Sequence, residues 1–262
     1  MTFSFIILGL LIGSFLNVII FRFDTGESVV SGRSRCNSCK KMIAWYDNIP
    51  VLSFVFLRGK CRNCGERISW QYPTVECVTA TLFMFVGQSF FFFGNTESAI
   101  QTVFSLGLIA ALIVVFVYDL STMEIPVSVL AFGVGWTVLS LFLLWYFASP
   151  QGAFSESRFA EGLIGGLIAF SIFYALVFFS RETWMGEGDA WLALMLGLVV
   201  GWTLLLPALT IAFGSGALFG IALILLHKKN LQSRIPFGPF LAASIMFMLF
   251  FGALVEQMFG FS

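Results

Sequence analysis

Apolar residues fill long stretches of the chain, and short polar segments separate these stretches. We predict eight apolar spans, at residues 3–21, 74–94, 99–118, 127–148, 160–180, 189–204, 207–226 and 237–258. Most of them approach the roughly 20 residues that a helix needs to cross a bilayer. Backbone groups find no water in the lipid core, so each span is expected to be helical. The pattern predicts an all-α polytopic membrane protein with about eight transmembrane helices.

The composition agrees with this pattern everywhere except in one segment. The chain is 59% hydrophobic and only 11% charged, whereas a soluble domain carries about 25% charged residues. Residues 22–73 are polar and basic, and only this segment has the character of a small water-facing domain. We therefore predict three parts: a first transmembrane helix at 1–21, a cytoplasmic domain at 22–73 and a helical bundle at 74–262.

Basic residues give the orientation in the membrane. Nine of the 14 Lys and Arg residues lie in the segment 22–73, and positive charge prefers the cytoplasmic side. Alternation from there places the loops 119–126, 181–188 and 227–236 on the cytoplasmic side as well. The lipid bilayer is thus an expected partner, and we expect no nucleic-acid partner.

Four cysteines form two Cys-x-x-Cys pairs within the basic segment: Cys36 with Cys39, and Cys61 with Cys64. Two such pairs at this spacing are typical of a four-thiolate zinc site. The alternative is two disulfides, which need an oxidising compartment, and the predicted orientation argues against one. A zinc ion with four protein ligands is structural, and it would stabilise a domain too small for its own core. The fifth cysteine, Cys77, is expected to be a small buried side chain.

Two aspartates stand beside the apolar spans. Carboxylates near lipid are rare and indicate function. Asp119 ends the third span and Asp189 begins the sixth, so both are expected at the cytoplasmic ends of their helices. Gly186 and Gly188 allow close approach of backbone or substrate to Asp189. Pro126 favours the start of the next helix after Asp119.

Two facing aspartates cannot both ionise cheaply, so they share a proton. The charged one can then activate water while the protonated one polarises a scissile carbonyl. Ordinary alternatives exist: Asp189 could be a helix N-cap, and Asp119 could pair with a Lys or Arg. Glu124 and Glu187 are rival carboxylates in the loops. The only histidine, His227, lies in a basic turn, which disfavours Ser-His chemistry and a His-rich metal site.

Six sequence motifs occur in an order that resembles one known family. They are "GSFLNVIIFR" at 13–22, "WYDNIPVLSFVFLRGKCRNC" at 45–64, "ISWQYPTVE" at 68–76, the Asp-x6-Pro spacing at 119–126, "GEGD" at 186–189 and "IPFGPFLA" at 235–242. Together they resemble the bacterial type IV prepilin peptidases, which belong to the Gly-x-Gly-Asp class of membrane aspartic proteases.

The resemblance implies an activity and a place in the cell. Members of the family cut the basic leader from prepilins and pseudopilins at the cytoplasmic face of the bacterial inner membrane. The catalytic pair of the family corresponds to Asp119 and Asp189. Many members also methylate the new N-terminus with S-adenosylmethionine. Two positions depart from the family pattern: Trp191 stands where Lys is common, and Val127 where Asp or Asn is common.

The methyltransferase site is the least defined by sequence. Glu76 is our candidate for a contact to the amine or to the cation of the methyl donor. Alternatively, Glu76 is a helix-start carboxylate that the helix dipole favours. Two other functions compete with the leader peptidase: a presenilin-like membrane aspartic protease, and a non-enzymatic transporter or scaffold whose aspartates bind protons or ions.

Overall fold

The computed structural model describes residues 2–25, 34–92, 94–148, 157–226 and 235–260. Within these ranges the regular structure is helical, apart from two isolated β-bridges. His227 lies outside the described residues. The chain divides into two compact units, Met1–Phe91 and Phe92–Ser262. The predicted all-α class is confirmed.

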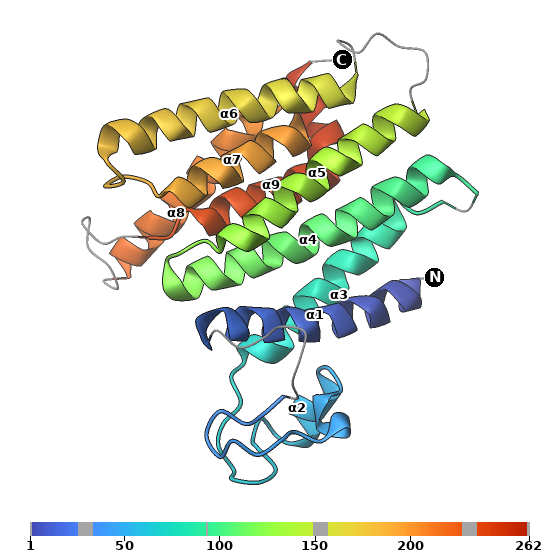
Figure 1. The fold of residues 1–262 in the computed structure, drawn as a ribbon, viewed down its shortest axis with the longest axis vertical. Helices are drawn as coiled ribbons and strands as arrows, with labels where there is room; N and C mark the ends of the chain where they lie inside the picture. Colours follow the sequence, from blue (N-terminus) through green and yellow to red (C-terminus); the bar gives the residue numbers. More distant parts are fainter. Residues whose placement is uncertain (1, 26–33, 93, 149–156, 227–234, 261–262) are drawn as a thin grey trace. The chain divides into compact units, whose positions relative to one another are not determined.

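The first unit is built on two helices, α1 (Thr2–Thr25) and α3 (Gln71–Ser89), which lie side by side (Figure 1). Glycine makes this approach possible, since a Cβ on Gly9 would lie 2.5 Å from the Cα of Ala80 and one on Gly13 would lie 2.8 Å from the Cα of Glu76. Small residues four apart bring membrane helices together in this way. Two short elements lie between these helices in the sequence: η1 (Trp45–Asn48) and α2 (Leu52–Phe56).

The second unit is a bundle of six helices in the described part of the chain (Figure 1). They are α4 (Thr96–Thr122), α5 (Val127–Ala148), α6 (Arg158–Ser180), α7 (Glu187–Val200), α8 (Leu205–Leu225) and α9 (Gly238–Phe259). Helix α7 is central, because it packs against α5, α6, α8 and α9. Its side chains Leu192, Met195 and Leu196 are fully buried. Gly197 of α7 meets the backbone of Gly165 on α6.

All eight predicted spans correspond to helices, and six of these helices are long and apolar enough to cross a membrane. The six are α1, α4, α5, α6, α8 and α9. Helix α7 has 14 residues, which gives a length of about 21 Å against a hydrocarbon core of about 30 Å. Helix α3 has 19 residues but a more polar composition. Membrane crossing by α3 and α7 stays a prediction.

Two details of the sequence-based expectation were wrong. The span predicted at 74–94 is helical only to Ser89, because the chain turns at Gly94, which has a φ of +82°. The side-chain oxygen of Asn95 then caps α4 by accepting a hydrogen bond from the N–H of Glu97 at 2.9 Å. Cys77 was expected to be buried but is exposed on α3, where an apolar thiol side chain is compatible with a lipid-facing position.

Candidate functional site

Asp119 lies in the last turn of α4, and its side chain is 4% exposed. The helix ends three residues later, where Met123 adopts a left-handed conformation and donates its N–H to the carbonyl of Asp119 at 2.9 Å. The hydroxyl of Thr122 accepts the N–H of Glu124 at 3.2 Å and fixes the turn. Helix α5 begins at Val127, directly after Pro126. The turn therefore holds the Asp119 carboxyl at the end of a long buried helix.

Asp189 lies in the first turn of α7 and is 9% exposed. The N-cap is Gly186, not Asp189, and the carboxyl oxygen Oδ2 of Asp189 accepts the N–H of Gly186 at 3.2 Å. This is the return half of a capping box, in which a side chain at the third helical position satisfies the N-cap amide. The Gly-x-Gly-Asp motif thus folds so that its aspartate turns back onto its own first glycine.

Three helix ends meet around Ile125 and bring the two carboxyl groups together. A Cβ on Gly188 of α7 would lie 3.0 Å from the Cβ of Ile125, and one on Gly238 of α9 would lie 3.1 Å from the Cδ1 of Ile125. Gly238 also lies directly against Oδ2 of Asp119, and its backbone N–H contacts the same carboxyl group. Asp119 is close enough to Asp189 for their charges to interact. Gly188 and Gly238 are therefore packing positions at the carboxylate pair.

Among the residues that the structure describes, the two carboxyl groups have no cationic partner. Within the described ranges neither Asp119 nor Asp189 belongs to an ion pair, and Oδ2 of Asp119 has no hydrogen-bond partner among the same residues. A buried polar atom without a partner is uncommon and needs an explanation. The rival carboxylates Glu124 and Glu187 are exposed. Of these four carboxylates, only the two aspartates have the burial that proton sharing requires.

Gly238 was missed by sequence reasoning, although its motif "IPFGPFLA" was noted. Gly238→Ala is expected to displace the Asp119 carboxyl, because the new Cβ would overlap Oδ2. Misplacing a reacting group by about 1 Å can lower a reaction rate about 100-fold, so we expect the rate of any reaction that uses the Asp119 carboxyl to fall by about this factor. The helix content and the membrane insertion of the variant should be unchanged. The matched control is Gly216→Ala on α8, whose Cβ would meet nothing closer than 3.4 Å. Full activity of Gly238→Ala would show that Asp119 does not depend on this contact.

Four of the five cysteines of the first unit, those of the two Cys-x-x-Cys pairs, form one cluster with all sulfur atoms within 4.8 Å of one another. All four are free thiols, and Sγ of Cys36 lies 3.8 Å from Sγ of Cys64. A tetrahedral zinc ion with Zn–S bonds of about 2.3 Å places its sulfurs about 3.8 Å apart. The pKa of the Cys36 thiol is lowered to about 7, mainly by the hydrogen bond from the backbone N–H of Cys39. Burial raises the pKa of this thiol, but by less. The donor set and spacing fit zinc.

The two cysteine pairs lie in turns of the same construction. Cys36 accepts the N–H of Lys40 at 2.9 Å and donates its own N–H to the carbonyl of Lys41 at 3.0 Å. Cys61 makes the equivalent bonds, to Gly65 at 2.9 Å and to Glu66 at 2.8 Å. Lys40 and Gly65 both have positive φ, at 56° and 73°. We call these turns the two knuckles, residues 35–42 and 60–67, which the β-bridges Arg35↔Met42 and Lys60↔Arg67 close.

An ion pair connects the second knuckle to η1. The guanidinium of Arg62 donates to both carboxylate oxygens of Asp47, at 2.8 and 2.6 Å, and stacks over the ring of Tyr46 at 5.4 Å. The hydrogen bond from Arg62 lowers the pKa of the Asp47 carboxyl. Bidentate pairs of this kind fix relative orientation as well as adding energy. The "WYDN" motif therefore positions the second knuckle, a role that sequence reasoning did not assign.

Glu76 is 6% exposed and belongs to α3 beyond its first turn. The explanation as a helix-start carboxylate therefore does not apply. Its Oε2 accepts the N–H of Val51 at 2.7 Å, at the start of α2. Val51 has a φ of 60°, so Glu76 helps to hold a strained turn. The Ser14 side chain also donates a hydrogen bond to the Glu76 carboxyl, so Val51 and Ser14 together hold this side chain.

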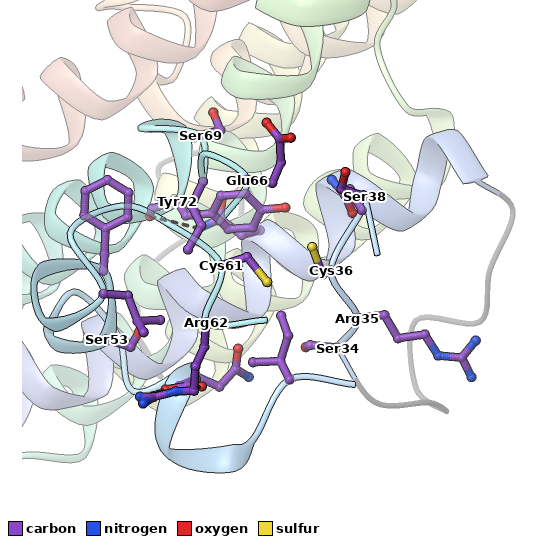
Figure 2. Close-up of a pocket in the computed structure, with 18 of the residues that line it drawn as sticks. Ser34, Arg35, Cys36, Ser38, Ser53, Cys61, Arg62, Glu66, Ser69 and Tyr72 are labelled. Atoms are coloured by element: carbon purple, nitrogen blue, oxygen red, sulfur yellow. Dashed lines mark hydrogen bonds and ion pairs between the residues drawn. The ribbon is translucent and has the colours of Figure 1, made fainter. Parts of the chain in front are cut away.

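A cavity of about 480 Å³ lies among these elements of the first unit. Its wall includes Glu76 and Tyr72 from α3, Asn17 from α1, and Cys36 and Cys61 from the knuckles. Figure 2 shows the two cysteines side by side at this cavity, with Tyr72 nearby. Binding sites for small molecules usually measure about 300–1,000 Å³, so the cavity is large enough for a cofactor-sized ligand.

Comparison with known proteins identifies the family. Residues 7–90 match the Bacterial Peptidase A24 N-terminal domain, and residues 106–221 match the Type IV leader peptidase family. These two matches cover most of the first and of the second unit, respectively. The chain belongs to the type IV leader peptidase family, the aspartic peptidase family A24 of multi-pass bacterial inner-membrane proteins. The resemblance drawn from the motifs is confirmed.

Several relatives carry the name "Prepilin leader peptidase/N-methyltransferase". The protein from Myxococcus xanthus is 36% identical over 224 residues, which are 84% of this chain and 62% of the relative. The protein from Bacillus subtilis is 31% identical over 94% of this chain and 92% of its own length. The protein from Aeromonas hydrophila is 32% identical over 95% and 90%, respectively. No solved structure matches the chain significantly.

Family membership separates the three functions that the sequence left open. It supports a leader peptidase rather than a presenilin-like protease or a transporter. Family membership alone does not assign roles to Asp119, Asp189, Glu76 and the cysteines.

Proposed function

We propose that this protein cuts the basic leader from type IV prepilins or pseudopilins and then methylates the new N-terminus. The names of the relatives support both activities. One structural observation carries the proteolytic part: Asp119 and Asp189 are both buried at helix ends that meet around Ile125, and neither has a cationic partner in the described residues. We assign Asp119 and Asp189 as the catalytic pair.

The helix ends suggest different roles for the two aspartates. Asp189 lies at the N-terminus of α7, where the helix dipole and the Gly186 N–H favour a negative carboxylate. Asp119 lies at the C-terminus of α4, where the dipole disfavours negative charge. Asp189 is therefore the base that takes a proton from water, and Asp119 is the acid that donates a proton to the scissile carbonyl oxygen. When the tetrahedral intermediate collapses, the leaving amine takes a proton from Asp189, and a hydroxyl of the intermediate returns a proton to Asp119. Both carboxyl groups are then in their starting states.

We assign the zinc site and the methyl transfer to residues of the first unit. Zinc bound by Cys36, Cys39, Cys61 and Cys64 would be structural, because four protein ligands leave no open position on the metal. S-adenosylmethionine would be the methyl donor. Glu76 would contact the amine or the sulfonium through carboxylate lone pairs that Val51 and Ser14 leave free.

The active site is proposed to face the cytoplasm. In a background depleted of cysteine, probes at Ser31 and Ser233 are expected to react from the cytoplasmic side, and a probe at Ser155 from the outside. All three positions lie outside the described residues. Labelling of Ser155 and Ser233 from the same side would contradict the orientation and the shared depth of the two aspartates.

Product analysis tests the whole proposal. Purified protein in lipid is mixed with a prepilin and S-adenosylmethionine, and the mature N-terminus is sequenced and weighed. We expect cleavage after the glycine that precedes the pilin's hydrophobic helix, and a mass increase of one methyl group. Cleavage inside the hydrophobic helix would favour a presenilin-like protease. A cut product without the methyl group would leave the chain a peptidase only.

A further inference from the structure

Helix α2 of the first unit presents an apolar face outward. Its side chains Leu52, Val55 and Phe56 are 56%, 64% and 81% exposed. Val55 and Phe56 follow Leu52 by three and four positions, so the three side chains share one face of the helix. A group of exposed apolar side chains on one element indicates a contact with a protein or a membrane. The segment predicted to face water therefore carries a surface that water does not suit.

The opposite face of α2 is directed inward. Ser53, Phe54 and Leu57 line the cavity of the first unit, and Figure 2 shows Ser53 at its wall. These three residues are half-buried. The ring of Phe54 also packs against that of Trp70, with 4.9 Å between the ring centroids. Helix α2 thus separates the cavity from the medium that surrounds the first unit.

The start of α2 is held level with apolar turns of α1. Val51 donates its N–H to the Glu76 carboxylate at 2.7 Å, and the Ser14 side chain of α1 donates to the same carboxyl group. Ser14 belongs to the stretch Thr2–Phe23, which is long and apolar enough to cross a membrane. It precedes Arg22, the basic residue in the last turn of α1, by eight positions. Eight helical residues rise about 12 Å, whereas half of a hydrocarbon core measures about 15 Å.

The backbone before α2 is satisfied as a position inside a membrane requires. Non-helical backbone at membrane depth is tolerated only where the protein itself supplies the hydrogen-bond partners. Val51 has a φ of 60°, and its N–H is bonded to Glu76. The next printed turn of bonds is local, since Ser53 donates its N–H to the carbonyl of Ile49 at 3.0 Å. Glu76 therefore satisfies a backbone donor that lipid could not satisfy.

We propose that α2 lies in the cytoplasmic leaflet of the membrane, with Leu52, Val55 and Phe56 in contact with lipid acyl chains. The charges that follow α2 fit this position. Arg58 and Lys60 come directly after the helix and are exposed. Long basic side chains can extend from apolar depth to the headgroup level, and the cytoplasmic leaflet attracts them through its anionic lipids.

An exposed tryptophan lies where the headgroups are expected. Tryptophan is enriched at membrane–water interfaces. Trp70 directly precedes α3 and is exposed. It is six positions before Glu76, which corresponds to about 9 Å along a helix, toward the cytoplasmic end of α3. Only part of the segment 22–73 then projects into water, and α2 belongs to the membrane-embedded part of the protein.

Photocrosslinking in native membranes tests the proposal. The photoreactive amino acid p-benzoylphenylalanine replaces Phe56 in the full-length protein, bacterial membranes are irradiated, and the adducts are identified by mass spectrometry. Adducts with phospholipid acyl chains are the expected result. The matched control is the same replacement at Met42 in the first knuckle, which is also exposed and should react little with lipid.

The identity of the adduct distinguishes the possible occupants of this face. Adducts of position 56 with residues 92–262 in place of lipid would show that the face packs on the second unit. Adducts with a co-expressed prepilin in place of lipid would show that it binds substrate. Either result would overturn the proposal. Lipid adducts as abundant at position 42 as at position 56 would also overturn it, because the knuckles would then lie equally deep.

A charge on the outward face gives a second test. A carboxylate at membrane depth is unfavourable, so Phe56→Asp is expected to displace α2 and to make trypsin cleavage after Arg58 about tenfold faster in nanodiscs. Met42→Asp should be cleaved at the wild-type rate, and equal thermal stability in detergent would show that both variants fold. An unchanged cleavage rate for a folded Phe56→Asp would contradict the proposal. If this variant does not fold, the crosslinking result decides.

Discussion

Asp119→Asn and Asp189→Asn should each abolish leader cleavage while the protein still inserts and purifies normally. Asparagine keeps the shape of the side chain but can neither share nor transfer the proton. Because groups that act as a unit lose nearly the whole rate when one is removed, we expect a fall of at least about 10⁴-fold for either variant. The measurement is the single-turnover cleavage rate of a prepilin, with helix content and thermal stability as checks.

Two matched variants make this result specific. Glu187→Gln and Glu124→Gln remove exposed carboxylates that lie two and five residues from the aspartates, and both should cleave at the wild-type rate. Appreciable turnover by Asp119→Asn or Asp189→Asn would remove that residue from the catalytic pair. A large loss in Glu187→Gln would instead point to the loop, where Trp191 donates weakly to Glu187 at 3.5 Å.

The contacts of the two aspartates predict that neither substitution has a large effect on folding. Asp189→Asn loses a carboxylate that accepts the Gly186 N–H at the start of α7, although the amide oxygen of asparagine can replace this bond. Asp119→Asn changes a carboxyl whose Oδ2 has no partner among the described residues. Neither substitution should therefore destabilise the fold strongly, and this makes a loss of activity easy to interpret.

The sequence predicted that both aspartates lie at helix ends, as the structure shows, and local rules were sufficient for this; their catalytic role stays a prediction. Asp119 and Asp189 interrupt apolar runs, and the basic loops placed both at the same membrane face. Their partner Gly238 could not be found in this way, since its contact with Asp119 joins residues more than one hundred positions apart. Periodicity and propensity describe a helix from its own residues, whereas the meeting of three helix ends depends on how the bundle packs.

In the first unit, too, local patterns in the sequence did not predict contacts between distant residues. The cysteine spacing predicted that the four cysteines of the two pairs lie together, as the structure shows, because two Cys-x-x-Cys pairs are typical of one shared site. The bond from Val51 to Glu76 and the pair of Asp47 with Arg62 were not predictable, because they connect different turns. The early end of α3 was missed for another reason: an aromatic run hid a turn that the left-handed Gly94 requires.

Loss of one cysteine from the cluster should release the zinc and loosen the segment between α1 and α3. Structural zinc sites contribute about 10–16 kcal/mol of binding free energy to small domains, and no residue of either knuckle is buried in a core that could replace this contribution. Cys36→Ser or Cys61→Ser is expected to lower the zinc content from one ion per chain to near zero. Limited proteolysis should then cut within residues 22–73, which the wild type protects.

Cys77→Ser is the matched control, because Cys77 is an exposed free thiol on α3 outside the cluster. It should keep one zinc per chain and the wild-type digestion pattern. The zinc-free variants are expected to lose their protection from protease, whereas Cys77→Ser should keep it. Elemental analysis that finds no zinc in wild-type protein kept reduced throughout purification would refute the assignment of the four cysteines as metal ligands.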